Sequence, residues 1–194
     1  CRVIQQPTRF ADHDEFAHAT NLRHLIESDQ LYTANAILPV TAYYPGLATI
    51  TGAVHQLTGL SPHTSGLIVT MSARIILAVA IFGLIRTLTK SERAAAAGVV
   101  VYACSPQILI FNSQYSYQTL ALPLSLLAIY LVARRMYEGA GSLAAPAVAA
   151  FVMAMTHHLT SVVVAVLWVA WLILVLLLGR GERNWTQRAL DLVV

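Results

Sequence analysis

The sequence predicts an all-α protein, a polytopic transmembrane helical bundle with amphipathic interfacial helices in a long outer loop. Two observations predict this fold. Of the 194 residues, 57% are hydrophobic and only 11% are charged, whereas soluble domains average about 25% charged residues because a surface in water needs them. The hydrophobic residues also form runs of about 14 to 20, a length that crosses a bilayer as helix. This composition excludes a cytosolic enzyme, a secreted disulfide scaffold and a disordered tail.

Composition also limits the compartment and the partners. Two cysteines are too few for a disulfide framework. The chain begins at Cys1 with no charged segment followed by an apolar stretch, so we expect no signal peptide and expect a fragment of a longer protein. The net charge of +3 does not indicate nucleic acid, because the basic residues stand at the ends of apolar runs instead of clustering on a soluble face.

Residues 1–64 are predicted to be an outer-face loop with two juxtamembrane helices. The first covers residues 14–28, where apolar side chains recur at helical spacing; they are Phe16, Leu22, Leu25 and Ile26. A loop over residues 35–46 feeds the second helix, because Pro45 suits a first helical position. Its apolar stripe consists of Leu47, Ile50, Val54 and Leu57. At about 15 residues and half polar, this helix is expected to lie along the membrane.

Residues 65–194 are predicted to form a transmembrane bundle of about four spans that ends in a cytoplasmic segment. The second span contains Pro106, which is tolerated where neighbouring helices satisfy the freed carbonyl. The predicted spans cover residues 65–85, 94–111, 119–133 and 143–178, the last as two helices interrupted by His157 and His158.

The basic residues predict how the bundle is oriented. Eight of the twelve Lys and Arg residues fall at 86–93, at 134–135 and after 178, whereas the connectors 112–118 and 157–158 contain none. Because cytoplasmic loops carry the excess of Lys and Arg, the first span runs from outside to inside and residues 1–64 lie outside. All seven histidines and five of the nine carboxylates then fall on the outer side. We therefore expect the chemistry there.

An acidic run, Asp12-His13-Asp14-Glu15, opens the first interfacial helix, and two roles fit it. As helix signals, Asp12 caps the helix while Asp14 and Glu15 complement the helix dipole in its first turn. As a site, Asp14 and His18 stand four residues apart on one face, within reach of one divalent ion or one hydroxyl proton.

Further candidate residues lie on the predicted outer side. Arg74 is the one charge inside an apolar run, and it either binds a phosphate or snorkels to the headgroups. His157 and His158 occupy a tight turn between two spans. Tyr44 is either an interfacial belt residue or a substrate contact. Gln114, in the 112–118 loop, either lines the site or is an ordinary connector residue.

The order of these features resembles the GT-C class of glycosyltransferases, multi-span enzymes that use polyprenyl-phosphate-linked sugars. In that class the first long outer loop carries an acidic motif of the D-x-D, D-E or E-x-D type, which Asp12-His13-Asp14-Glu15 matches. In its aminoarabinose and protein mannosyl transferase relatives, an interfacial helix, a Pro-containing stretch, a Gly-Leu-Ser-like turn and a span beginning with Ala-Arg follow. The similar segments here are residues 14–28, Tyr43-Tyr44-Pro45-Gly46-Leu47, Gly59-Leu60-Ser61 and Ser72-Ala73-Arg74-Ile75-Ile76. The resemblance covers residues 12–97, without the usual first span or the C-terminal outer domain.

The resemblance implies a multi-pass enzyme of the plasma membrane that moves a sugar from a polyprenyl-phosphate donor to an acceptor on the outer face. Asp14 or Glu15, in the motif that Asp12 opens, would act as general base or as a ligand of a divalent metal. Arg74 would hold the leaving phosphate. The topology adds His157 and His158 as a proton donor or a second metal ligand. The expected partners are the bilayer and the lipid-linked donor, and no nucleic acid.

Three other interpretations stay open. A transporter subunit would use Arg74 and the outer histidines in a permeation path, but it predicts internal symmetry, and the sequence contains no visible repeat. A non-catalytic membrane scaffold would use the acidic run only to start a helix. A truncated enzyme would need the segments that the resemblance lacks.

Overall fold

The computed structural model describes residues 9–10, 13–106, 108 and 113–178. Over these residues the chain forms seven α-helices and one short 3-10 helix and no strand, which confirms the all-α class. The elements are α2 (His13–Ser28), η1 (Pro39–Tyr43), α3 (Gly46–Thr58), α4 (Pro62–Thr89), α5 (Glu92–Ala103), α6 (Tyr117–Glu138), α7 (Ala144–Thr156) and α8 (His158–Leu178).

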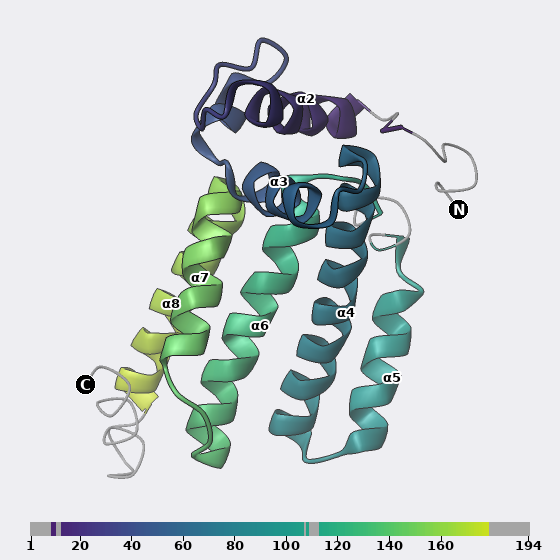
Figure 1. The fold of residues 1–194 in the computed structure, drawn as a ribbon. Coiled ribbons are helices and arrows are strands. Elements are labelled where there is room, and N and C mark those ends of the chain that lie inside the picture. Colours follow the sequence, from purple (N-terminus) through teal and green to yellow (C-terminus); the bar gives the residue numbers. More distant parts are fainter. Residues whose placement is uncertain (1–8, 11–12, 107, 109–112, 179–194) are drawn as a thin grey trace.

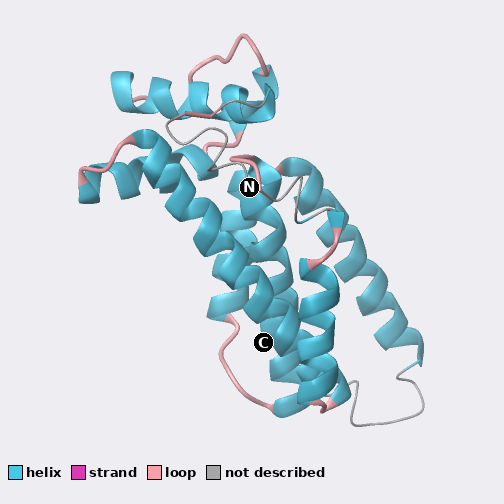
Figure 2. Cartoon of the chain, turned by 90° about the vertical axis from the view of Figure 1, so that its right-hand side faces the viewer, coloured by secondary structure: helices cyan, strands magenta, loops and turns pink. Residues whose placement is uncertain are grey.

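The helices form a bundle with a cap. Helices α4 to α8 run alongside one another, and α2 and α3 lie across one end of them (Figure 1). A view turned by 90° shows the same bundle and cap (Figure 2). We call the end beneath α2 and α3 the capped end. We call the opposite end the basic end, because the α4–α5 connection and the last turn of α6 carry Arg86, Lys90, Arg93, Arg134 and Arg135.

Two of the described helices, α4 with 28 residues and α6 with 22, are long and apolar enough to cross a membrane. In contrast, α5 and α7 have 12 and 13 residues, fewer than the roughly 20 that a crossing needs. Of the expected span over residues 94–111, α5 covers the part up to Ala103, and Ser105 N then donates to Tyr102 O in a turn (3.0 Å) just before Pro106. Residues 107 and 109–111 of that span lie outside the described residues. A residue that precedes proline disfavours the helical conformation. The number of crossings stays a prediction.

Local signals explain where α4 begins and ends. Ser61 caps it, since its hydroxyl accepts a hydrogen bond from Thr64 N (3.1 Å), and Pro62 follows in the first turn. Lys90 ends α4 in the left-handed conformation (φ 57°). The next residue, Ser91, then caps α5 by accepting from Ala94 N (3.2 Å). The sharp α4–α5 connection is therefore encoded within a few residues.

The cap is joined to the bundle by one hydrophobic cluster. It combines Leu22 of α2 and Leu47 of α3 with side chains from α4 and from the start of α6, namely Val69, Ala73, Tyr115, Tyr117 and Leu120. Close approach is possible at Gly46, where a Cβ would lie 2.5 Å from Thr156 Oγ1 and 2.9 Å from the Met155 carbonyl oxygen at the end of α7. The cap is thus packed on α4, α6 and α7.

The predicted apolar stripes of α2 and α3 were only partly right. The buried residues of α2 are Ala17, His18, Asn21 and Leu22, while Phe16 is 49% exposed. In α3 the predicted stripe residue Leu57 is 87% exposed. The buried face of α2 includes the polar residues His18 and Asn21 because it packs on Tyr117. The ring of this tyrosine offers an apolar contact and its hydroxyl a polar one.

Candidate functional site

Glu15 lies in the first turn of α2 and holds the segment that leads into α6. Its Oε1 atom accepts a hydrogen bond from Tyr115 N (3.1 Å), just before the N-cap residue Ser116 of α6. A carboxylate also suits the first turn of α2, because the first amides of a helix carry partial positive charge. His63, at the start of α4, lies within electrostatic range of Glu15. Glu15 therefore links α2 to the beginnings of α4 and α6.

The Asp14 side chain lies at the protein surface. It is 66% exposed, and its carboxylate lies 3.7 Å from the ring nitrogen Nδ1 of His13, which is itself 89% exposed. Both acidic residues of the first turn complement the dipole of α2. The third predicted catalytic carboxylate, Asp12, lies outside the described residues. The two neighbouring carboxylates thus differ, since Asp14 is exposed and Glu15 is engaged in the fold.

His18 is buried beneath α2, with 6% of its surface exposed. Its ring centroid lies 4.1 Å from that of Tyr117, and among the described residues its Nδ1 atom has no hydrogen-bond partner. Burial lowers the pKa of His18 from 6.5 to about 4, a shift that nearby Asp14 opposes and His157 reinforces. His18 is therefore uncharged near neutral pH.

A buried hydrogen-bond network surrounds this histidine. The Tyr117 hydroxyl accepts from Asn21 Nδ2 (2.9 Å) and donates to the Thr41 carbonyl oxygen (2.8 Å). Asn35 donates through Nδ2 to Asn21 Oδ1 (2.6 Å) and to the Ala17 carbonyl oxygen (2.9 Å). The network joins α2, the segment that follows it and α6, and it satisfies polar groups whose burial would otherwise cost free energy.

Tyr115 forms a second buried link. Its hydroxyl donates to Thr51 Oγ1 of α3 (2.9 Å), and its ring stacks on Phe10 with centroids 4.5 Å apart. Burial raises the pKa of the Tyr115 phenol above its ordinary value. This side chain remains protonated and acts as a fixed donor toward α3.

The predicted histidine pair occupies the α7–α8 turn, next to the Tyr117 network. His157 contacts Thr160 Oγ1 through Nδ1 (2.7 Å) at the start of α8, and its ring centroid lies 6.4 Å from that of Tyr117. His158 lies 5.0 Å from Tyr44 and 5.4 Å from His157, measured between ring centroids. The structure thus brings three predicted residues, Tyr44, His157 and His158, together, and His157 lies within electrostatic range of His18.

Arg74 contacts the connector between α5 and α6, and Gln114 is part of that connector. Arg74 Nη2 donates to the Ile108 carbonyl oxygen (3.1 Å), and the Gln114 carbonyl oxygen accepts from Thr119 Oγ1 (2.8 Å). Arg74 stands eleven residues after His63 on α4, so its backbone lies about 16 Å farther from the capped end. Arg74 and Glu15 therefore contact the same connector at different distances from the capped end. Arg74 contacts it at Ile108, and Glu15 contacts it at Tyr115.

The predicted metal pair does not extend into a metal site. Within the described part of the chain, no three His, Cys, Asp or Glu side chains are grouped to hold a metal ion. Asp14 is exposed while the ring of His18 packs on Tyr117. This donor set does not fit a divalent ion.

Sequence reasoning missed the amides and hydroxyls of the network, Asn21, Asn35, Thr41 and Thr51. A signal for Asn21 existed, because it stands three residues after His18 and one residue before Leu22. Asn35 had none, since its partners lie 14 and 18 residues away.

Comparisons with protein-family models, with curated proteins and with solved structures found no match for this chain.

Proposed function

We propose that this chain is part of an integral membrane glycosyltransferase that moves a sugar from a polyprenyl-phosphate donor to an acceptor at the membrane surface. The observation that carries the proposal is the acidic pair at the capped end. One carboxylate, on Asp14, is exposed, and the next, on Glu15, is held 3.1 Å from Tyr115 N, within electrostatic range of His63. A transferase needs an accessible base and a fixed scaffold around it.

The outer faces of the helices support a membrane location. On α4, Ile75 and Val79 are 66% and 56% exposed, and on α8, Val162 and Val166 are 60% and 61% exposed. A helix that is apolar on its outer side as well as its inner side fits a lipid environment, because a soluble bundle carries polar residues outside. The capped end would then lie at one bilayer surface, where a lipid-linked sugar presents its headgroup.

The contacts divide the roles between the two carboxylates. Asp14 is the better general base, because an exposed carboxylate can reach an acceptor hydroxyl. Glu15 is a positioning residue, since its carboxylate holds the connector that also contacts Arg74. In this proposal Arg74 contributes positive charge toward the donor phosphate as its negative charge grows. His157, His158 and Tyr44 form a polar and aromatic wall suited to a sugar ring.

A second candidate is a non-catalytic membrane protein, or a transporter subunit, in which the acidic pair only organises the fold. The pairing of Asp14 with His13 and the use of Glu15 as a clamp favour it. Under this alternative, Asp14 contributes the helix-dipole interaction of an exposed residue, about 0.3–1 kcal/mol, and no reaction depends on it.

The test is sugar transfer by the protein reconstituted in vesicles with a panel of polyprenyl-phosphate sugars. We expect Asp14→Asn to lower the transfer rate by roughly a hundredfold or more, because general-base catalysis contributes that much. Glu27→Gln, an exposed acid at the other end of α2, is the matched control and should leave the rate unchanged.

Two results would contradict the proposal. The first is that no member of the panel is turned over by the folded wild-type chain. The second is that Asp14→Asn and Glu27→Gln behave alike. Either result would favour the non-catalytic alternative. Thermal unfolding of each variant, followed in parallel, separates a loss of activity from a loss of fold.

A further inference from the structure

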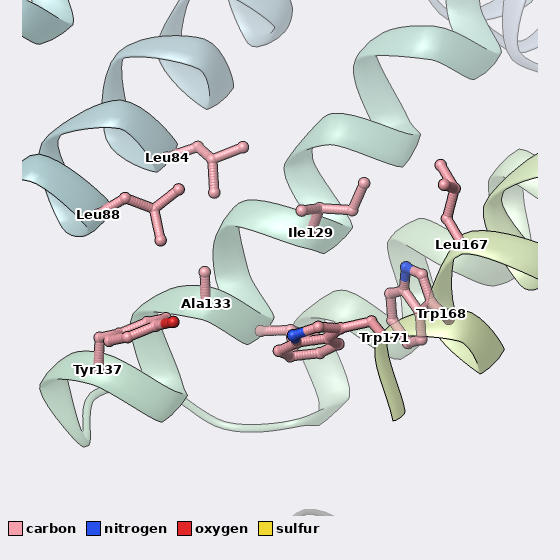
Figure 3. A pocket seen from close by; sticks show the side chains of 9 residues that line it. Leu84, Leu88, Ile129, Ala133, Tyr137, Leu167, Trp168 and Trp171 are labelled. Atoms are coloured by element: carbon pink, nitrogen blue, oxygen red, sulfur yellow. The ribbon is translucent and has the colours of Figure 1, made fainter. Parts of the chain in front are cut away.

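A groove lies near the basic end of the bundle, far from the capped end. Helix α6 forms its floor with Ile129 and Ala133, and the small alanine leaves the space open (Figure 3). Its volume is about 270 Å³, near the lower limit of small-molecule sites. The walls come from Leu84 and Leu88 of α4 and from Trp168 and Trp171 of α8.

The groove opens sideways, toward the outer faces of α4 and α8. Its rim residues Leu88 and Leu167 are 53% and 55% exposed. The same two helices carry the exposed apolar residues that support a membrane location, such as Val79 and Val166. In a bilayer the groove would therefore open to lipid chains instead of water, and an apolar chain is the ligand that its lining fits.

The net positive charge of the basic end favours anionic lipids. The described residues at the basic end include five cations and two carboxylates, Glu92 and Glu138. Glu138 accepts from Thr87 Oγ1 (3.2 Å) and lies 3.5 Å from Lys90 Nζ and 3.7 Å from Arg134 Nε. Cations therefore exceed carboxylates by three, beside the groove residue Tyr137. Basic residues at a bilayer surface attract anionic lipids by about 1 kcal/mol each.

The aromatic lining fits the same depth in a membrane. Trp168 and Trp171 are three residues apart on α8 and so share a face. Tryptophan and tyrosine gather at the level of lipid headgroups because their rings combine apolar surface with one polar group. Figure 3 shows both indoles on the α8 side of the groove and Tyr137 on the α6 side, toward its end.

We propose that this groove binds an acyl chain of an anionic phospholipid, with the lipid phosphate held by the basic residues at the same end of the bundle. The acyl chain would fill the space over Ala133, and Lys90 and Arg134 would turn from Glu138 toward the phosphate. The site differs from the proposed transferase site, because Leu84 stands 21 residues after His63 on α4, about 32 Å along the helix. It rests on membrane insertion and not on sugar transfer.

The experiment uses the groove tryptophans as reporters. The chain has three tryptophans, and replacing Trp185, which lies outside the described residues, by Phe leaves Trp168 and Trp171. The Trp185→Phe protein is reconstituted in vesicles that contain phosphatidylglycerol or phosphatidylcholine with dibrominated acyl chains, which quench nearby tryptophan on contact. We expect half-maximal quenching at a mole fraction of the brominated anionic lipid at least threefold lower than for the zwitterionic lipid.

Two pairs of variants, made in this background, separate chain binding from headgroup binding. Lys90→Gln with Arg134→Gln should bring the preference for phosphatidylglycerol close to one. Arg9→Gln with Arg23→Gln removes the same charge on the capped-end side and should preserve the preference. Leu88→Phe narrows the groove and should weaken quenching by both lipids about twofold. Its control, Leu159→Phe, changes a similarly exposed leucine (58% against 53%) outside the groove.

Three outcomes would overturn the proposal. Equal quenching by the two lipids would mean that ordinary bilayer lipid contacts the groove without selection. An unchanged preference in the Lys90 and Arg134 double variant would remove the phosphate contact. Absence of quenching in protein that is dimeric by cross-linking would show that a second copy covers the groove. Asp14→Asn should leave all lipid quenching unchanged, so failure of the transferase assay leaves this test intact.

Discussion

The two ends of the bundle hold their polar groups in opposite ways. At the capped end, Asn35 and Tyr117 are 2% and 5% exposed and are satisfied by a network that joins three parts of the chain. At the basic end, Glu138 is 34% exposed and meets Lys90 and Arg134 at 3.5 and 3.7 Å. The first end depends on buried hydrogen bonds, the second on exposed ion pairs.

The comparison explains why the capped end is the better candidate for a catalytic site. Desolvation strengthens the buried hydrogen bonds of the capped end and lowers the pKa of His18, because few water molecules compete with these buried groups. Exposed ion pairs are worth about 0–1 kcal/mol because water and salt screen them. Chemistry that needs groups with shifted pKa values is therefore expected at the capped end. Attraction of charged surfaces is expected at the basic end.

The largest expected effect is at Asn35. Asn35→Ala removes two donated and two accepted hydrogen bonds, the latter from Ile37 N and Leu38 N. We expect a loss of roughly 3 kcal/mol in the free energy of opening the cap, since each buried group left unsatisfied costs about 1–3 kcal/mol. Hydrogen exchange of α2 and α3 amides measures it. Gln30→Ala, an exposed amide of the same connection, is the control, and an equal effect there would contradict a buried network.

The second effect depends on pH through His18. Its pKa is about 4 in the fold and 6.5 when unburied, so the detached cap binds more protons as pH falls below 6.5. The free energy of opening the cap should therefore be constant above pH 6.5 and fall toward pH 4, by at most about 3 kcal/mol.

Hydrogen exchange across this pH range tests the histidine. His18→Phe should remove most of the slope, although Asp14 and His157 also face this position. His13→Gln removes an imidazole that is 89% exposed, and it should keep the slope. A slope that survives in His18→Phe would assign the pH response to other groups.

The smallest effect is expected at the basic end. Glu138→Gln breaks contacts with Lys90 and Arg134, but an exposed ion pair is worth less than about 1 kcal/mol. The melting temperature should fall slightly at low salt and hardly at all at high salt. A loss above about 2 kcal/mol, or one insensitive to salt, would show that the basic end is as desolvated as the capped end.

Several features followed from local sequence. Apolar runs predicted α4 and α6, because length and hydropathy alone define a helix that can cross a membrane. Apolar residues recurring at helical spacing predicted a helix over residues 14–28, and α2 covers His13–Ser28. The positions of basic residues at the ends of apolar runs predicted that five of them gather at the end of the bundle opposite the histidine turn at 157–158; they are Arg86, Lys90, Arg93, Arg134 and Arg135.

The arrangement of the capped end could not be predicted in this way. Asp14 and Glu15 are adjacent carboxylates with the same local signal, yet one is exposed and the other accepts a bond from Tyr115, 100 residues later in the chain. His18 and Asn21 are buried only because Tyr117 arrives from α6. Periodicity places side chains on a helix face, but the packing partner decides which face is buried.

The sequence by itself therefore determined the helices, their apolar character and the gathering of five basic residues at the end of the bundle opposite the histidine turn. These properties depend on neighbours within a few turns of the chain. Only the tertiary structure decided which carboxylate is engaged, which histidine is desolvated, and that Ala133 leaves a groove between α4 and α8. Those outcomes depend on contacts between segments distant in sequence, because burial and the resulting shift in pKa are set by the groups that surround a side chain in space.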